Sequence, residues 1–241
     1  MAIFPIQLEL INHIMTLLDG PAKMMSLGYP DVLATRAMIE KIFGDKVAGR
    51  LAFRNDGEGI IKWHNMSAEL TELVDSEKLF SLIGVDFECI DIVVSRQIER
   101  VVDLNYPAPD DLFEKYQIVI DPGTIEHCAN IGQAMMNLAG MTAAGGFVVH
   151  MNPLAMFNHG FYNLNPTFYA DFYEHNGFKI EFLGGVTGNG LVRQVFQVPV
   201  YGRFHKVPEN ASLVVVARRE KVQPLGWPMQ KKYRVNSTLT G

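Results

Sequence analysis

The chain has 241 residues, of which 48% are hydrophobic and 20% are charged, proportions typical of a folded globular protein rather than a disordered one. The length suits one large α/β domain or two small ones. The formal net charge of −5 argues against a protein that grips nucleic-acid phosphates or an anionic membrane surface, so neither partner is expected.

The cysteines and the first residues indicate a reducing compartment. Cys89 and Cys128 do not belong to any metal-ligand spacing, and we expect both to be reduced thiols. The first apolar stretch lacks a basic flank and carries Glu9 and Asp19, which argues against a signal peptide. The uncharged stretch 128–170 is broken by prolines and polar residues and is not expected to span a membrane. A cytoplasmic location is the expectation.

In the first third of the chain, apolar residues recur at helical spacing in some segments and form short continuous runs in others. Proline and glycine mark the boundaries between these segments. The predicted elements are a helix over 5–19, a strand over 23–27, a sharp loop over 28–31, a helix over 32–43, a loop or cover over 49–66 and a helix over 67–83.

Three successive apolar runs each end in an acidic residue: Asp91, Asp103 and Asp121. The unalternating run 118–120 suits a strand buried on both faces, and intervening helices imply a parallel sheet. Further predicted elements are a helix over 131–142, a strand over 147–151, a helix over 167–176, a strand over 178–183, an extended pair over 192–200 and a strand over 212–218.

We expect one domain of 1–241. Its core covers about 22–185 and 212–220, with an insertion at 186–211 and a tail at 221–241 that packs loosely or contacts another subunit, as in a homo-oligomer.

Five motifs occur in a characteristic order: SLGYPDVL at 26–33, ECID at 88–91, VVDLN at 101–105, YQIVIDPGTIEH at 116–127 and AAGGFVVHMNP at 143–153. Together they resemble the motifs of class I S-adenosylmethionine-dependent methyltransferases over about residues 22–185. The resemblance implies a Rossmann-like α/β fold, with a mostly parallel seven-stranded sheet, helices on both faces and an antiparallel last strand. Residues 152–178 are similar to methyltransferases encoded with sugar and surface-glycan enzymes.

The resemblance implies S-adenosylmethionine as cofactor and S-adenosylhomocysteine as product. Asp91 would bind the ribose hydroxyls, and Asp103 with Leu104 would flank adenine. Ser26 stands where the family carries an acidic residue, so Asp31 becomes the candidate for the cofactor's amino group. The full predicted cofactor set is Gly28, Tyr29, Pro30, Asp31, Asp91, Ile92, Asp103, Leu104, Asp121, Pro122 and Gly123.

Methyl transfer from a sulfonium is an in-line displacement that depends mainly on positioning, and a base is needed only for a protonated nucleophile. His127 and His159, on loops at the carboxyl edge of the sheet, are the predicted catalytic residues. Each also has a structural alternative, since His127 could stabilise its turn and His159 could pack against a neighbouring aromatic ring. The predicted acceptor-binding residues are Asn130, Asn158 and Tyr162.

The expected activity is methyl transfer to a hydroxyl, amine or amide of a small polar acceptor, a sugar or nucleotide-linked metabolite. The alternative is a catalytically silent methyltransferase-like binding protein or partner subunit. A nicotinamide-dependent enzyme is disfavoured because no GxGxxG follows the first strand. Asp121, Glu126, His127 and His159 could supply oxygen and nitrogen metal ligands, but no spacing demands a metal and none is expected.

Overall fold

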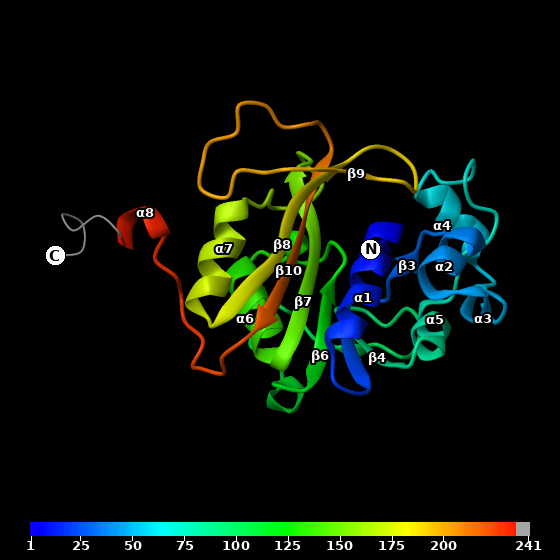
Figure 1. Ribbon diagram of the computed structural model, residues 1–241, viewed down its shortest axis with the longest axis horizontal. Coiled ribbons are helices and arrows are strands. Elements are labelled where there is room, and N and C mark those ends of the chain that lie inside the picture. Colours follow the sequence, from blue (N-terminus) through cyan, green and yellow to red (C-terminus); the bar gives the residue numbers. More distant parts are fainter. Residues whose placement is uncertain (235–241) are drawn as a thin grey trace.

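The computed structural model describes residues 1–234, which form one eight-stranded sheet between two groups of helices (Figure 1). In sheet order the strands are β5 (Arg100–Val101), β4 (Val85–Asp91), β2 (Ala22–Leu27), β6 (Tyr116–Asp121), β7 (Thr142–Ala155), β10 (Ala211–Arg219), β8 (Phe178–Thr187) and β9 (Gln194–Phe196). The first five run parallel, whereas β10 is antiparallel to both β7 and β8. The predicted Rossmann-like fold class, with its mostly parallel sheet and antiparallel last strand, is confirmed.

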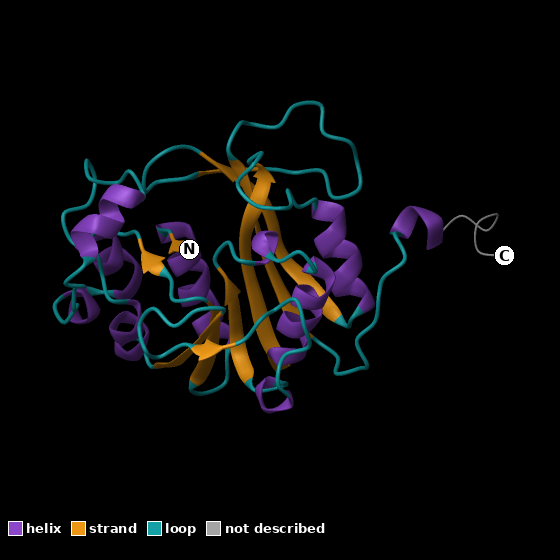
Figure 2. Cartoon of the chain, turned by 180° about the vertical axis from the view of Figure 1, so that it is seen from behind, coloured by secondary structure: helices purple, strands orange, loops and turns teal. Residues whose placement is uncertain are grey.

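Helices cover both faces of the sheet, as the view from behind also shows (Figure 2). One face is covered by α1 (Pro5–Leu17), α2 (Arg36–Phe43) and α5 (Ser76–Leu82), and the other by α6 (Ile131–Met141) and α7 (Pro166–His175). Successive strand residues alternate between the faces: Met24 and Ile118 pack on the α1 side, and Met25 and Val119 pack on the α6 side. The central strands β2 and β6 are therefore buried on both faces, as the unalternating run 118–120 predicts for β6, whereas β5 at the edge of the sheet is exposed.

The remaining elements are short. They are β1 (Ala2–Ile3), which pairs with β3 (Asp31–Val32) outside the main sheet, α3 (Asp45–Ala48), α4 (Gly57–Trp63), α8 (Lys231–Arg234) and the 3-10 turns Asp110–Leu112 and Ile125–His127. Within residues 1–234, no helix is long and apolar enough to cross a membrane.

The predicted helix over 32–43 begins later than expected. Val32 pairs with Ile3 in the small β1–β3 sheet, so the chain is still extended there. The helix starts only after Thr35, whose hydroxyl accepts a hydrogen bond from the Met38 amide at 3.2 Å.

The predicted helix over 67–83 is wrong in its first half. Residues 67–72 form a turn and a bend, and Val74 forms isolated bridges with Val32 and Phe53. Asp75 then caps α5 by accepting from the Lys78 amide at 2.9 Å. The segment 49–66, predicted as loop or cover, contains the helix α4.

The segment expected as an insertion contributes the eighth strand. The predicted extended pair over 192–200 is instead the single strand β9, which pairs with β8 and not with its own neighbours. In the expected tail, the Gly226 amide donates to Asn176 and Arg234 pairs with Asp171 at 3.0 Å, so this segment contacts α7 and its end. Residues 235–241 of that expected tail lie outside the described residues.

The strand order contains a switch point beside β2. From β2 the chain continues to β4 and β5 on one side, and then crosses to β6 on the other side. In open α/β sheets, ligands bind beyond the carboxyl ends of the strands at such a point.

Candidate functional site

A cavity of about 130 Å³ lies at the carboxyl ends of β2, β4, β5 and β6. Six predicted site residues contribute to its wall: Gly28, Asp91, Ile92, Asp103, Leu104 and His127. The sequence analysis missed its other lining residues: Ile90, Val102, Asn105, Thr124 and Cys128. Ile90, Val102 and Asn105 are immediate neighbours of predicted residues, so widening each strand-end motif by one position would have found them.

Asp91 and Asp103 each use one carboxylate oxygen to hold their own turn. Oδ1 of Asp91 accepts from the Ile92 amide at 2.7 Å, and Oδ1 of Asp103 accepts from the Asn105 amide at 2.9 Å. Oδ2 of Asp91 faces Gly28, since a Cβ built on that glycine would lie 3.2 Å from it. Two carboxylates from adjacent strands thus face one cavity, an arrangement suited to hydroxyl and amino groups of a ligand.

The Gly28 turn is covered by the side chain of Met1. Gly28 has a φ of +86°, and a Cβ there would collide with the end of the Met1 side chain. The hydroxyl of Thr124 donates to the Leu27 carbonyl at 2.7 Å, and its oxygen lies 3.0 Å from the Met1 sulfur. The Met1 thioether therefore fills the space directly over the turn, and the cavity is smaller than the roughly 300–1,000 Å³ of common ligand pockets.

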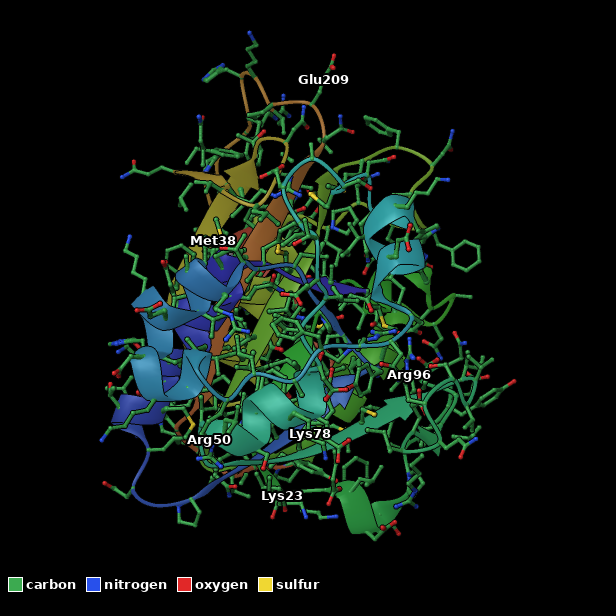
Figure 3. The ribbon with its side chains drawn as sticks, turned by 90° about the vertical axis from the view of Figure 1, so that its right-hand side faces the viewer. Lys23, Met38, Arg50, Lys78, Arg96 and Glu209 are labelled. Carbon is green, nitrogen blue, oxygen red and sulfur yellow. The ribbon has the colours of Figure 1, made fainter. Side chains whose placement is uncertain are left out.

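Asp31 does not line this cavity. Its Oδ1 pairs with Arg54 at 2.5 Å and its Oδ2 with His64 at 3.0 Å, so both oxygens are engaged. The neighbouring Tyr29 is buried with the guanidinium groups of Arg54 and Arg96 over its ring. Figure 3 shows Arg96 on the side of the molecule where β4 ends. The structure thus places Asp31 and Tyr29 in an ion-pair and cation–π cluster with the segment around Arg54.

Asp121 is fully buried and belongs to a polar network behind the cavity. It accepts from the Thr124 amide at 2.9 Å, from Nδ1 of His150 at 2.8 Å and from the Asn152 side chain at 2.8 Å. A carboxylate only accepts, so His150 donates from Nδ1, and its Nε2 accepts from the Tyr173 hydroxyl at 2.5 Å. Burial raises the pKa of Tyr173 well above its usual value, which keeps that proton on the hydroxyl.

The neighbours of Asp121 in the predicted set, Pro122 and Gly123, form the turn that follows β6. His150 is a core histidine, fully buried and hydrogen-bonded at both ring nitrogens.

Glu126 lies between this network and the cavity rim. Asn152 donates to its Oε2 at 2.9 Å, while Oε1 is buried and has no hydrogen-bond partner among residues 1–234. Nε2 of His159 lies 3.6 Å from Oε1 and Nε2 of His127 lies 3.9 Å from it. Burial, followed by the negative charge of Asp121, raises the pKa of Glu126 to about 7. Burial and the charge of His159 hold the pKa of His127 below its usual value.

Two hydrogen bonds between their segments bring the two histidines together although they lie 32 positions apart in the chain. The Phe161 amide donates to the Glu126 carbonyl at 2.8 Å, and the Tyr162 hydroxyl donates to the Ala129 carbonyl at 2.7 Å. The ring centroids of His127 and His159 lie 5.2 Å apart. The structure therefore brings both predicted catalytic residues to one place, beside Glu126.

The predicted acceptor-binding residues lie around the same loop. Asn130 caps α6 by accepting from the Gln133 amide at 3.2 Å, and its own amide donates to Asn105 at 2.8 Å. Asn158 adopts a left-handed backbone conformation with a φ of +63°, one residue before His159. Tyr162 donates its hydroxyl to the backbone as described above. Asn130 and Tyr162 thus have structural roles, and contact with a ligand would be a second role for each.

A larger cavity of about 420 Å³ lies between α7 and the segment before α8. Its lining does not include any of the predicted site residues, nor any residue of β2, β4, β5 or β6 or of the turns that follow them. The smaller cavity is therefore the candidate functional site.

No family model matches the sequence, and no curated protein matches it either. Several solved structures are similar to the chain at low identity. They include the citrinin polyketide synthase CMeT domain (10% identity, TM-score 0.48, covering 91% of this chain and 52% of that one) and TehB from Haemophilus influenzae (12%, 0.45, 87% and 61%). A third is the Burkholderia thailandensis 1,6-didemethyltoxoflavin-N1-methyltransferase with bound 1,6-didemethyltoxoflavin and S-adenosylhomocysteine (12%, 0.46, 90% and 78%).

This chain spans 52% and 61% of the lengths of the first two of these structures. Identities of 10–12% and TM-scores below 0.5 do not assign an activity to this chain.

Proposed function

We propose that this protein transfers a methyl group from S-adenosylmethionine to a small polar acceptor and releases S-adenosylhomocysteine. The observation that carries the proposal is the placement of Asp91 and Asp103 on adjacent strand ends, facing one cavity with Gly28 at the switch point of the sheet. Asp91 would bind the ribose hydroxyls, and Asp103 with Leu104 would flank the adenine. Solved methyltransferases of similar architecture, one of them with bound S-adenosylhomocysteine, are consistent with this assignment.

We propose His127, which lines the cavity, and His159 beside it as the catalytic residues at the acceptor end. Because the pKa of His127 is held low, its imidazole is neutral near pH 7 and can accept a proton from an acceptor hydroxyl. Exposed aromatic side chains at Phe157 and Phe161 flank His159 and offer flat surfaces to a sugar or a nucleotide-linked acceptor. A hydroxyl of such a metabolite is the favoured methyl acceptor, with an amine or amide as the other option.

A second candidate is a catalytically silent binding protein or partner subunit with this fold. Two observations favour it: Met1 fills the space over Gly28, and Arg54 and His64 engage both oxygens of Asp31. In the methyltransferase proposal, Met1 must be displaced when the cofactor binds, and the cofactor's amino group must find a partner other than a free Asp31 carboxylate.

Calorimetric titration with S-adenosylhomocysteine, with NAD as the control ligand, separates the candidates. Micromolar binding of the first ligand alone supports the cofactor site and justifies a screen of sugar and nucleotide-sugar acceptors for methylation. Binding without turnover on any acceptor favours the silent protein. If the folded protein binds neither ligand, the cofactor assignment fails.

A further inference from the structure

A buried carboxylate and two half-exposed imidazoles face one another at the edge of the cavity. Glu126, His127 and His159 each offer one ligand atom, and these atoms all lie within 4.8 Å of one another. We propose that the three residues bind one divalent transition-metal ion.

The Glu126 carboxylate is oriented as a metal ligand would be. Asn152 donates to Oε2 of Glu126, and Tyr169 in turn donates its hydroxyl to Oδ1 of Asn152 at 2.5 Å. This chain of bonds directs Oε1 toward the two imidazoles, where it is buried without a hydrogen-bond partner in the described part of the chain. A buried carboxylate oxygen without a partner is costly when it is charged, and a bound cation would offset that cost. Neighbours that orient a ligand in this way are a regular part of metal sites.

The position of His159 is set by contacts other than those of its own ring. The Phe161 amide and the Tyr162 hydroxyl fasten its loop to the turn that carries Glu126 and His127. Gly160 permits the close approach, because a Cβ there would lie 2.9 Å from the Glu126 carbonyl oxygen and 3.1 Å from Nδ1 of His127. The loop is therefore built to hold an imidazole against Glu126.

The three ligand atoms, which lie within 4.8 Å of one another, must move closer together for coordination. With metal–ligand bonds of about 2.0–2.1 Å, tetrahedral ligand atoms lie roughly 3.3 Å apart. Oε1 of Glu126 is 3.6 Å and 3.9 Å from the two imidazole nitrogens, and both histidine side chains are 49% exposed, so their rings are free to turn inward. Two imidazoles with one carboxylate favour ions such as Zn²⁺, Co²⁺ or Fe²⁺ over Mg²⁺ or Ca²⁺.

Three protein ligands leave at least one coordination position open, as in catalytic rather than structural metal sites. The proposal that an ion binds here does not depend on the proposed methyl transfer. Its role toward an acceptor does rest on that proposal: the open position would hold an acceptor oxygen, and His127 and His159 would then act through the ion as its ligands.

The test is a titration of chelator-treated protein with Co²⁺, followed by visible absorption, with metal content of the dialysed protein measured by mass spectrometry. We expect one Co²⁺ per chain and a visible spectrum of low coordination number, with Zn²⁺ displacing the Co²⁺. Glu126→Gln, which keeps the size of the side chain, and His159→Ala should each weaken binding by roughly 10-fold or more. His13→Ala, which removes an exposed histidine from α1, is the matched control and should bind as the unaltered chain does.

The absence of saturable Co²⁺ binding, or equal binding by Glu126→Gln and the unaltered chain, would overturn the proposal. S-adenosylhomocysteine affinity is measured on the same samples without metal. A variant that loses metal binding but still binds S-adenosylhomocysteine is defective in the metal site alone. If the unaltered protein binds the metal but not S-adenosylhomocysteine, the metal site stands and the methyl-transfer proposal fails.

Discussion

The two sides of the candidate cavity hold their carboxylates in different ways. On the β4 and β5 side, Asp91 and Asp103 are partly exposed, and their hydrogen bonds are to backbone or side-chain groups one or two residues further along. On the β6 and β7 side, Asp121 and Glu126 are fully buried and are bonded to Asn152, a residue on another strand.

Because of this difference, we expect one pair of carboxylates to affect mainly ligand binding and the other pair to affect mainly the stability of the fold. A carboxylate held only by its own turn can be removed with little loss of folding free energy, so its main effect should be on a ligand. A buried carboxylate that joins β6, β7 and α7 leaves several partners unsatisfied when it is removed. Four predictions test this comparison.

The largest expected effect is on stability and comes from Asp121→Ala. The substitution leaves the buried His150 and Asn152 side chains without their shared acceptor, so the free energy of unfolding should fall by on the order of 3 kcal/mol. Urea unfolding followed by circular dichroism measures it. Asp91→Ala on the opposite side should cost less than about 1 kcal/mol, and equal costs for the two variants would remove the distinction between the sides.

The next effect is on binding and comes from the same Asp91→Ala variant. Under the proposed function, loss of this carboxylate weakens S-adenosylhomocysteine binding by on the order of 1–3 kcal/mol, because a charged hydrogen-bond partner of the ribose is lost. Calorimetry on the folded variant measures the change. Asp19→Ala, remote from the cavity in sequence, serves as the control, and an unchanged affinity in Asp91→Ala would reject the assignment of Asp91.

More of the β4 and β5 side of the cavity could be predicted from the sequence than of the β6 and β7 side. The first side depends on local sequence patterns, and the second depends on tertiary contacts. The strand ends at Asp91 and Asp103 follow from apolar runs closed by an acidic residue, and both residues line the cavity. Asn152 was inside a recognised motif, but its role depends on a register in which β7 lies beside β6, which the sequence does not encode locally.

The same limit applies to two other contacts that the sequence analysis did not predict. Met1 reaches Gly28 because β1 pairs with β3, and Asp31 is engaged because the segment of Arg54 folds over it. Both contacts join segments that are far apart in the chain, and neither periodicity nor motifs can predict such contacts. Fold class is predictable from the repeated strand–helix pattern, whereas the occupancy of a turn by a distant side chain is not.

A smaller effect on stability is expected from a substitution in the loop of His159, which packs against Glu126 on the buried side of the cavity. Gly160→Ala places a methyl group 2.9 Å from the Glu126 carbonyl oxygen, so the loop must shift at a cost of about 1–2 kcal/mol. Thermal unfolding measures the loss, and the Co²⁺ titration should show weaker binding, since His159 moves with the loop. Gly59→Ala in α4 is the matched control, because its Cβ meets open space and alanine favours the helix. Equal stability of the two variants would show that the loop is not closely packed on Glu126.

The smallest effect is expected at the far end of the buried network. Tyr173→Phe removes the hydroxyl that donates to Nε2 of His150 while the ring keeps its packing, so the unfolding free energy should fall by about 1 kcal/mol. Tyr106→Phe removes a hydroxyl from a ring that is 67% exposed and should leave stability unchanged. A further readout is the tautomer of His150 by ¹⁵N chemical shifts: Asp121 should keep the proton on Nδ1 in both variants. A proton that moves to Nε2 in Tyr173→Phe would mean that Tyr173, not Asp121, sets the orientation of the histidine, and the network would then be anchored in α7 instead of in β6.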